Sequence, residues 1–169
     1  MNDIHVQSLE SSSIEVVTQS GNITSKSLKG DVIQLTSQSG NINCQGVTQG
    51  NITFQSESGV RFNNMNNKIN NVIISSIQDI HGHRFQGPNL EIKTATGNIS
   101  TESIYSDVSR FSSQKGNINL KNLHRQCYVT ISDNGNLTIC NWLYLNVVKK
   151  YHERLQQPEI FRILISAVV

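Results

Sequence analysis

A 19-residue repeat limits the folds open to this chain more than any other feature of its sequence. The tripeptide Gly-Asn-Ile or Gly-Asn-Leu occurs six times, and all copies but the one at Gly50 recur at a spacing of i+19 or three times that step. These tripeptides begin at Gly21, Gly40, Gly50, Gly97, Gly116 and Gly135. Self-similarity at a fixed period of this length is the signature of repeat proteins, in which each repeat packs mainly on its neighbours.

Apolar residues follow the same period in four columns, which begin at positions 4, 9, 14 and 16. The first column reads Ile4, Ile23, Ile42, Arg61, Ile80, Ile99, Ile118 and Leu137. The other columns are expected to bring Val47, Tyr128 and Thr130 into the core as well. Because the columns lie in two groups half a repeat apart, each repeat contains two short apolar segments.

These segments alternate apolar with polar residues, as in Ile42-Asn43-Cys44 and Ile52-Thr53-Phe54. A period of two is typical of β-strands, and the glycine that precedes many of the segments favours a turn. The sequence therefore predicts an all-β fold, a single-stranded β-solenoid with 19-residue coils. Each coil has two short strands, and the chain has length for about seven coils.

Polar residues test this register independently, because stacking places residue i beside residue i+19. Three pairs at this spacing carry opposite charges, and no pair in the repetitive body carries like charges. The pairs are Glu10–Lys29, Glu91–Arg110 and Glu102–Lys121. The same spacing predicts that Asn22 stacks on Asn41 and that Asn98, Asn117 and Asn136 form a second stack joined by hydrogen bonds.

The chain divides into a repeat domain over residues 1–141 and an apolar, basic tail over residues 142–169. Four apolar residues of the tail share one helical face, namely Tyr144, Val148, Tyr151 and Leu155. This spacing predicts an amphipathic helix over 142–157 that caps the last coil. A splice-derived, poorly ordered segment that adheres to partners or membranes is the alternative. Uncapped solenoid ends expose strand edges, so self-association through these ends is expected.

Three segments of the repeat resemble a known family. Gln38–Ile42, Gln49–Ile52 and Ala95–Ile99 are similar to repeats of the adhesin-like domain of unknown function, a bacterial β-solenoid family. Within it, Lys93–Asn122 resembles the eukaryotic group named family with sequence similarity 185, member A. The resemblance covers about residues 2–140 and implies a fold, but it implies no activity and no site residues.

Charge balance argues against nucleic acid as a partner. Residues 1–140 contain as many basic as acidic side chains, and the surplus in the formal net charge of +2 lies in the tail. Phosphate binding needs concentrated positive charge, which the neutral body lacks. The sequence also contains no run of about 18 apolar residues that would span a membrane as a helix.

Cysteine usage and the N-terminus predict the compartment. The three cysteines form no Cys-x-x-Cys motif, which favours a reducing environment. Residues Met1–His5 resemble neither a signal peptide nor an Arg-rich transit peptide. We therefore expect this chain to be intracellular and cytoplasmic, and we interpret it as a truncated or spliced form of a longer solenoid. The eukaryotic resemblance implies mitochondria for such a longer form.

One coil breaks the pattern, because Arg61, Asn66 and Asn71 occupy three of the apolar columns. A ligand-binding defect in the solenoid is one interpretation. The other is a register change by one residue, which would bring in Val60 or Phe62, with Met65 and Val72, as core residues. Apolar residues next to every interruption favour the register change.

The pair His81 and His83 is the closest approach to a metal-binding motif. Residues i and i+2 of a strand share a face, so both imidazoles could reach one ion. A structural zinc site needs four ligands, however, and the residues at i+19 from this pair are Ser100 and Glu102. We therefore predict no metal site and no cofactor.

Catalytic constellations are equally sparse. No acidic residue stacks on another at i+19, glycines occur singly, and Cys44 lies in a core position. The sequence predicts a non-catalytic scaffold or interaction module whose flat polar faces bind a protein or a glycan. Arg61, His81, His83 and Arg84 are the candidate binding residues. The alternatives are a carbohydrate-active enzyme that uses the region from Arg61 to Arg84 and a non-functional truncated product.

Overall fold

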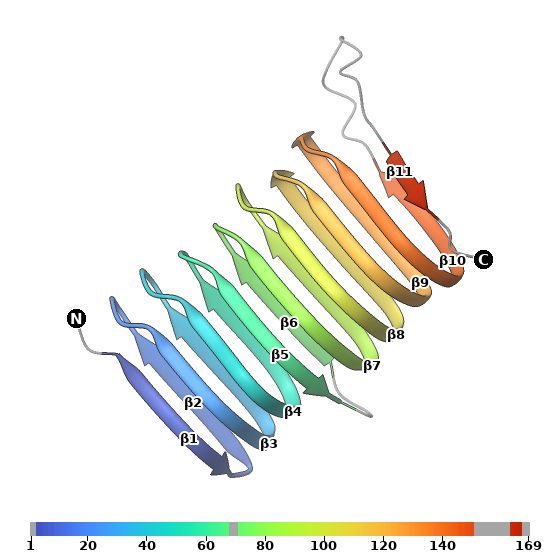
Figure 1. Cartoon of the computed structure of the whole chain (residues 1–169). Coiled ribbons are helices and arrows are strands. Elements are labelled where there is room, and N and C mark those ends of the chain that lie inside the picture. The colour runs from blue at the N-terminus through green and yellow to red at the C-terminus, as the bar shows by residue number, and fades with distance from the viewer. Residues whose placement is uncertain (1–2, 68–70, 151–162, 167–169) are drawn as a thin grey trace.

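A computed structural model describes residues 3–67, 71–150 and 163–166, in which all regular structure is β and no helix occurs. The strands are β1 (Ile4–Glu10), β2 (Ser13–Thr18), β3 (Ile23–Ser37), β4 (Ile42–Ser56), β5 (Val60–Asn66), β6 (Asn71–Ser76), β7 (Ile80–Thr94), β8 (Ile99–Lys115), β9 (Ile118–Asn134), β10 (Leu137–Lys150) and β11 (Ile163–Ser166). Every pairing among them is parallel. The predicted β-solenoid of about seven coils is confirmed (Figure 1).

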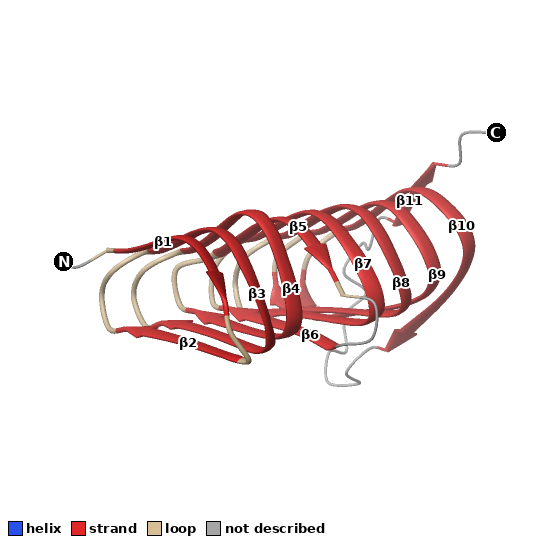
Figure 2. Cartoon of the chain, turned by 90° about the horizontal axis from the view of Figure 1, so that it is seen from below, coloured by secondary structure: helices blue, strands red, loops and turns tan. Residues whose placement is uncertain are grey.

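Each coil contributes to two facing sheets (Figure 2). The first sheet contains β1, β5 and the first halves of the long strands, with Ile4, Ile23, Ile42, Val60, Ile80, Ile99, Ile118 and Leu137 in register. The second sheet contains β2, β6 and the second halves of the long strands. Loops join the two layers along one edge, and curved strands join them along the other.

The core lies between the two sheets, where alternate side chains of the strands up to Cys140 point inward. Four fully buried phenylalanines provide its largest side chains, namely Phe54, Phe62, Phe85 and Phe111. Burying a side chain of this size contributes about 1.5–3 kcal/mol relative to leaving it exposed. The apolar columns therefore supply the main driving force for stacking the coils.

The predicted asparagine stacks are confirmed along the looped edge, which we call the Gly-Asn edge. The backbone N–H of Asn41 donates to Oδ1 of Asn22 at 2.9 Å. In the second stack, Asn117 N–H donates to Asn98 Oδ1 at 2.9 Å, and Asn136 N–H donates to Asn117 Oδ1 at 2.8 Å. Each amide thus satisfies a backbone donor of the next turn, which the parallel sheet leaves unpaired.

An aspartate begins each stack. Oδ1 of Asp3 accepts the backbone N–H of Asn22 at 2.8 Å, and Oδ1 of Asp79 accepts that of Asn98 at 2.7 Å. Between the two stacks Gly59 occupies the position of an asparagine, so the series is interrupted there. The interruption falls at the start of the coil whose sequence breaks the repeat.

Buried serines support the same turns. Ser37 Oγ donates to the carbonyl of Gly21 at 2.9 Å and accepts the N–H of Gly40 at 2.9 Å. Ser56 repeats this arrangement one coil later, with the carbonyl of Gly40 at 2.8 Å and the N–H of Gly59 at 3.0 Å. These hydroxyls are buried at low cost because both of their hydrogen-bonding functions are used.

The one-residue register change predicted for the irregular coil is confirmed. Ile42 pairs with Val60, an i+18 step, and Val60 pairs with Ile80, an i+20 step. The core residues of this coil are Val60, Phe62, Met65, Val72 and Ile74. Arg61 points outward and is exposed, so its charge does not enter the core. Asn67 is a fully buried polar residue of this coil, and its Oδ1 accepts the N–H of Gly50 at 2.8 Å.

Four core assignments from the strict 19-residue period are wrong, and one of them is Leu9 of the first coil, which is 40% exposed. Val47 is 44% exposed, and its neighbour Thr48 is buried instead. Tyr128 and Thr130 are replaced in the core by the residues that precede them, Cys127 and Val129. In both places the register of neighbouring strands shifts by one residue at the bend of the coil. Near the second shift, Arg125 adopts the left-handed backbone conformation, with φ 67°.

Of the three predicted charge pairs, one forms an ion pair. Lys29 Nζ lies 2.6 Å from Glu10 Oε1. Glu91 and Arg110 are in register on β7 and β8, but the carboxylate of Glu91 contacts Lys93 on its own strand. Glu102 and Lys121 are also in register, and the carboxylate of Glu102 faces a histidine described below. Such exposed pairs contribute about 0–1 kcal/mol each.

The helix predicted over 142–157 is wrong for residues 142–150, which continue β10. Trp142 pairs with Leu123 and Val148 pairs with Tyr128 along the edge of β9. That edge offers a row of backbone donors and acceptors, which a strand satisfies and a helix does not. Residues 151–157 of the predicted helix lie outside the described residues. Beyond them, β11 pairs with β10, with Ile163 opposite Leu137.

Candidate functional site

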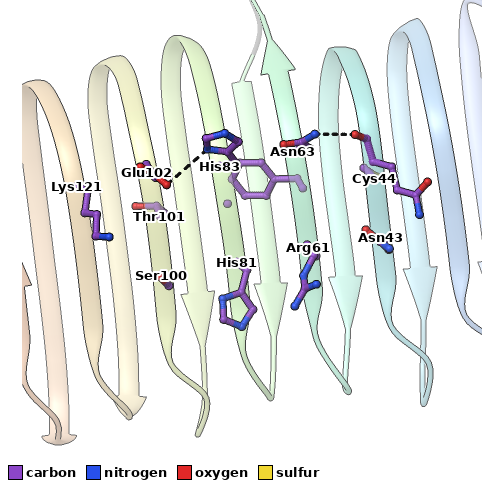
Figure 3. A pocket seen from close by; sticks show the side chains of 13 residues that line it. Asn43, Cys44, Arg61, Asn63, His81, His83, Ser100, Thr101, Glu102 and Lys121 are labelled. Atoms are coloured by element: carbon purple, nitrogen blue, oxygen red, sulfur yellow. Dashed lines mark hydrogen bonds and ion pairs between the residues drawn. The ribbon is translucent and has the colours of Figure 1, made fainter.

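A shallow groove crosses the outer face of the first sheet, with a volume of about 450 Å³. It runs over β4, β5, β7, β8 and β9, along the axis of the solenoid (Figure 3). Two rows of outward side chains border it. One row consists of Asn43, Arg61, His81 and Ser100, and the other consists of Gln45, Asn63, His83, Glu102 and Lys121. We call this feature the polar groove.

The floor of the polar groove lies between the rows. It is formed at Cys44, Phe62 and Thr101, whose side chains point inward and are buried, and at Gly82. These residues are paired in register across β4, β5, β7 and β8, so their backbone groups lie within the parallel ladder. A ligand would therefore meet mainly side-chain donors and acceptors.

Gly82 is required by the packing beneath this floor. A Cβ atom at position 82 would lie 2.1 Å from Cζ of Phe62, because the phenyl ring occupies the space that a side chain would need. Phe62 is 1% exposed, so it has little room to move. The glycine between the two histidines is thus explained by core packing.

Two interactions organise the border of the polar groove. Nδ1 of His83 lies 3.7 Å from Oε2 of Glu102 on the next coil. Nδ2 of Asn63 donates to the carbonyl of Gln45 at 2.9 Å. Arg61 and Lys121 have no ion pair within 4.0 Å in the part of the chain that the structure describes. Both cations are exposed and therefore available to a ligand.

The structure places three of the four candidate binding residues at one site. Arg61, His81 and His83 border the polar groove, whereas Arg84 is exposed on β7 and does not line it. Glu102 follows His83 by one regular i+19 step, so the sequence repeat alone predicts that the two side chains are neighbours. Asn63 escapes the sequence prediction because the step from it to His83 is i+20.

A second hollow of about 430 Å³ adjoins the polar groove at the Gly-Asn edge. It shares Arg61 and His81 with the groove and opens where Gly59 interrupts the asparagine stacks. Asp79 also lines it. Arg61 thus stands between the two hollows, on the irregular coil.

The cysteines have the properties of core residues. Burial raises the pKa of the Cys44 thiol to about 11 and that of the Cys127 thiol to about 12. Both thiols are protonated near neutral pH and are poor nucleophiles or metal ligands. Among the described residues, no group of three or more His, Cys, Asp or Glu side chains is arranged to hold a metal ion.

The fold and the groove together define a class of protein: a parallel β-solenoid whose coils are joined by Gly-Asn turns and that carries a polar groove on one sheet. The model of the Toastrack family, DUF4097, matches residues 48–141, which is more than half of the chain. The chain belongs to this family, a domain family of unknown function. Searches among curated proteins and among solved structures found no match. In the described part of the chain, no helix has the length and apolar character needed to cross a bilayer.

Proposed function

We propose that this chain is a non-catalytic interaction module that binds an extended polar ligand in the polar groove. The observation that carries the proposal is the alignment of hydrogen-bonding side chains in two rows by successive coils. The parallel ladder fixes the backbone from which these side chains project, so binding does not have to order a loop as well, and this pre-organisation favours affinity.

The composition of the groove favours binding over glycoside hydrolysis. Hydrolysis of a glycosidic bond ordinarily needs two carboxyl groups on opposite sides of the bond. Glu102 is the only acid among the residues that line the polar groove. Asp79 in the neighbouring hollow already accepts the N–H of Asn98 with one of its oxygens. The carbohydrate-active enzyme is therefore the second candidate.

Three further assignments belong to the same proposal. Within the Toastrack family, we place the chain in the eukaryotic group that Lys93–Asn122 resembles. We propose a reducing, intracellular compartment, in line with the free thiols of Cys44, Cys127 and Cys140. We also retain the division into a repeat domain over 1–141 and a distinct tail over 142–169, with self-association through the solenoid ends.

A panel of neutral and charged oligosaccharides and extended peptides tests the proposal. Binding is measured by calorimetry, and each mixture is analysed for cleavage products. We expect at least one binder, no products, and loss of binding in Arg61→Ala. Arg84→Ala is the matched control, because it removes the same charge from a position outside the groove. Cleavage products, or equal losses in both variants, would contradict the proposal.

A further inference from the structure

We propose that the polar groove binds a linear acidic glycan, a chain of β-1,4-linked sugars with carboxylate groups. This inference rests on the proposed function and names the chemical class of the ligand. It follows from three properties of the groove: its charge, its direction across the strands and the chemistry of its borders.

Positive charge predominates at the groove. Arg61 and Lys121 are permanently charged and lack ion-pair partners within 4.0 Å in the described part of the chain. The one acid of the lining, Glu102, faces the imidazole of His83 at 3.7 Å. A carboxylate ligand would therefore find two cations that have no ion-pair partner within 4.0 Å among the described residues. The nearest acid in the lining, Glu102, is in register with Lys121 on the neighbouring strand.

The two cations fit the spacing of sugars along a chain. Arg61 on β5 and Lys121 on β9 are three strand steps apart, roughly 14 Å at about 4.8 Å per step. A pyranose unit is about as long as one such step, so three sugars span this distance. The two side chains belong to opposite borders of the groove (Figure 3). In a β-1,4-linked chain successive sugars face opposite ways, so carboxylates three sugars apart point to opposite borders.

An extended peptide fits the groove less well. Peptides that bind sheets as added strands pair with free backbone groups at a sheet edge. The groove crosses the middle of the first sheet, where the backbone groups of β5, β7 and β8 pair with one another. Its borders instead present amide side chains, including Asn43 and Asn63, which can donate to and accept from sugar hydroxyls.

A matched pair of sugars tests the inference. The probes are a β-1,4-linked hexamer of glucuronate and cellohexaose, which differ only by the carboxylates, together with hexaglutamate. We expect the glucuronate hexamer to bind at least about tenfold more tightly than cellohexaose, as charged hydrogen bonds imply. Arg61→Gln and Lys121→Gln should each weaken it by about tenfold, and Arg84→Gln should leave it unchanged. Thermal melting of each variant verifies that the fold is intact.

The outcomes separate this inference from the proposed function. If cellohexaose binds as tightly as the glucuronate hexamer, the claim that the ligand is acidic is overturned, and the groove is still a glycan-binding site. Hexaglutamate binding that depends on Arg61, without glycan binding, would overturn the glycan and keep an interaction module. Failure of all three probes to bind would overturn the inference, while the broader panel decides the proposed function. If the glucuronate hexamer still binds after both Gln substitutions, its site is not the polar groove, and this result would contradict both the inference and the proposed function.

Discussion

The coils of β7, β8 and β9 differ from the coil of β5 and β6 in strand continuity, in the asparagine stack at the turn and in the register step to the next coil. The long strands β7–β9 stay in i+19 register along the first sheet, and Asn98, Asn117 and Asn136 continue the stack at their turns. The coil of β5 and β6 consists of two separate strands. It starts at Gly59, where the asparagine stack is interrupted, and its register steps are i+18 and i+20 in place of i+19.

Both hollows of the surface touch this irregular coil, and Arg61 lines both of them. In the regular coils, the turn residues Asn98, Asn117 and Asn136 hydrogen-bond from one coil to the next. Chemistry directed at a ligand requires side chains that the stack does not use. The comparison therefore indicates that the regular coils supply most of the stability. The irregular coil creates the two hollows, to which side chains of β7, β8 and β9 also contribute.

The largest effect is expected from a charge placed in a regular core column. Ile118→Asp would bury a carboxylate without a partner, which we expect to cost more than about 4 kcal/mol and to abolish cooperative unfolding. Asn119→Asp, one residue along on the half-buried outer side, should cost less than about 1 kcal/mol. Thermal and urea unfolding of both variants measure this, and equal losses would refute the assignment of inner and outer faces.

The contact between the irregular coil and β7 gives the next largest effect. Gly82→Ala places a methyl group against Phe62, and overpacking of this kind costs about 1–3 kcal/mol. Phe62→Leu in the same chain should relieve much of this loss, because the clash is with a side chain. At Gly97 the added Cβ would lie 2.1 Å from the carbonyl carbon of Gln78, so no side-chain truncation should rescue Gly97→Ala. Additive losses for Gly82→Ala and Phe62→Leu in a double-mutant cycle would contradict the packing described here.

The asparagine stacks should show a smaller difference. Asn98→Ala removes the acceptor of the Asn117 N–H, with an expected cost of about 1–2 kcal/mol. Asn41→Ala should cost less, because the N–H of Gly59 donates to Ser56 Oγ and does not need Asn41. Urea unfolding of the two variants compares them directly. A greater loss in Asn41→Ala would show that the stack is not interrupted at Gly59.

The smallest effect concerns the pH dependence of stability at Asp3, the residue that begins the first asparagine stack. The backbone N–H of Asn22, and then its side-chain amide, lower the pKa of Asp3 below its usual value of 3.8. A lowered pKa in the folded state means that Asp3 stabilises the fold above its unfolded pKa and loses this contribution as pH falls through the folded pKa. Asp3→Asn should therefore lower the melting temperature slightly at pH 7 and not at about pH 2. A difference that persists unchanged at the acid pH would contradict this assignment.

The sequence predicts the solenoid well because period, turn residues and charge pairs agree with one another. It also predicts the register change at Arg61, since apolar neighbours such as Val60 and Phe62 stand beside each interruption. It does not predict the shifts that expose Val47 and place Cys127 in the core. Those shifts depend on how the backbone bends between the two sheets, where an apolar or aromatic residue, Val47 or Tyr128, stands directly beside the residue that the fold buries.

The tail shows a different limit. The spacing of its apolar residues suits a helix, yet residues 142–150 form part of β10, because a strand can form backbone hydrogen bonds with the open edge of β9.

The candidate site is predicted only in part. The sequence brings His81, His83 and Glu102 together through regular steps, whereas Asn63 joins them through an i+20 step that only the fold reveals.

The division of labour between regular and irregular coils is tested most directly by making the irregular coil regular. In such a chimera, residues 60–79 are replaced by a copy of residues 99–117 and one asparagine is inserted after Gly59, which makes both register steps i+19 and removes Arg61 and Asn63. The measurement is the free energy of unfolding in urea. We predict a value equal to or higher than that of the native chain, because the inserted coil stacks on its neighbours with a regular core and regular turns. A loss of several kcal/mol would contradict the account, since it would make the irregular coil a requirement of the fold.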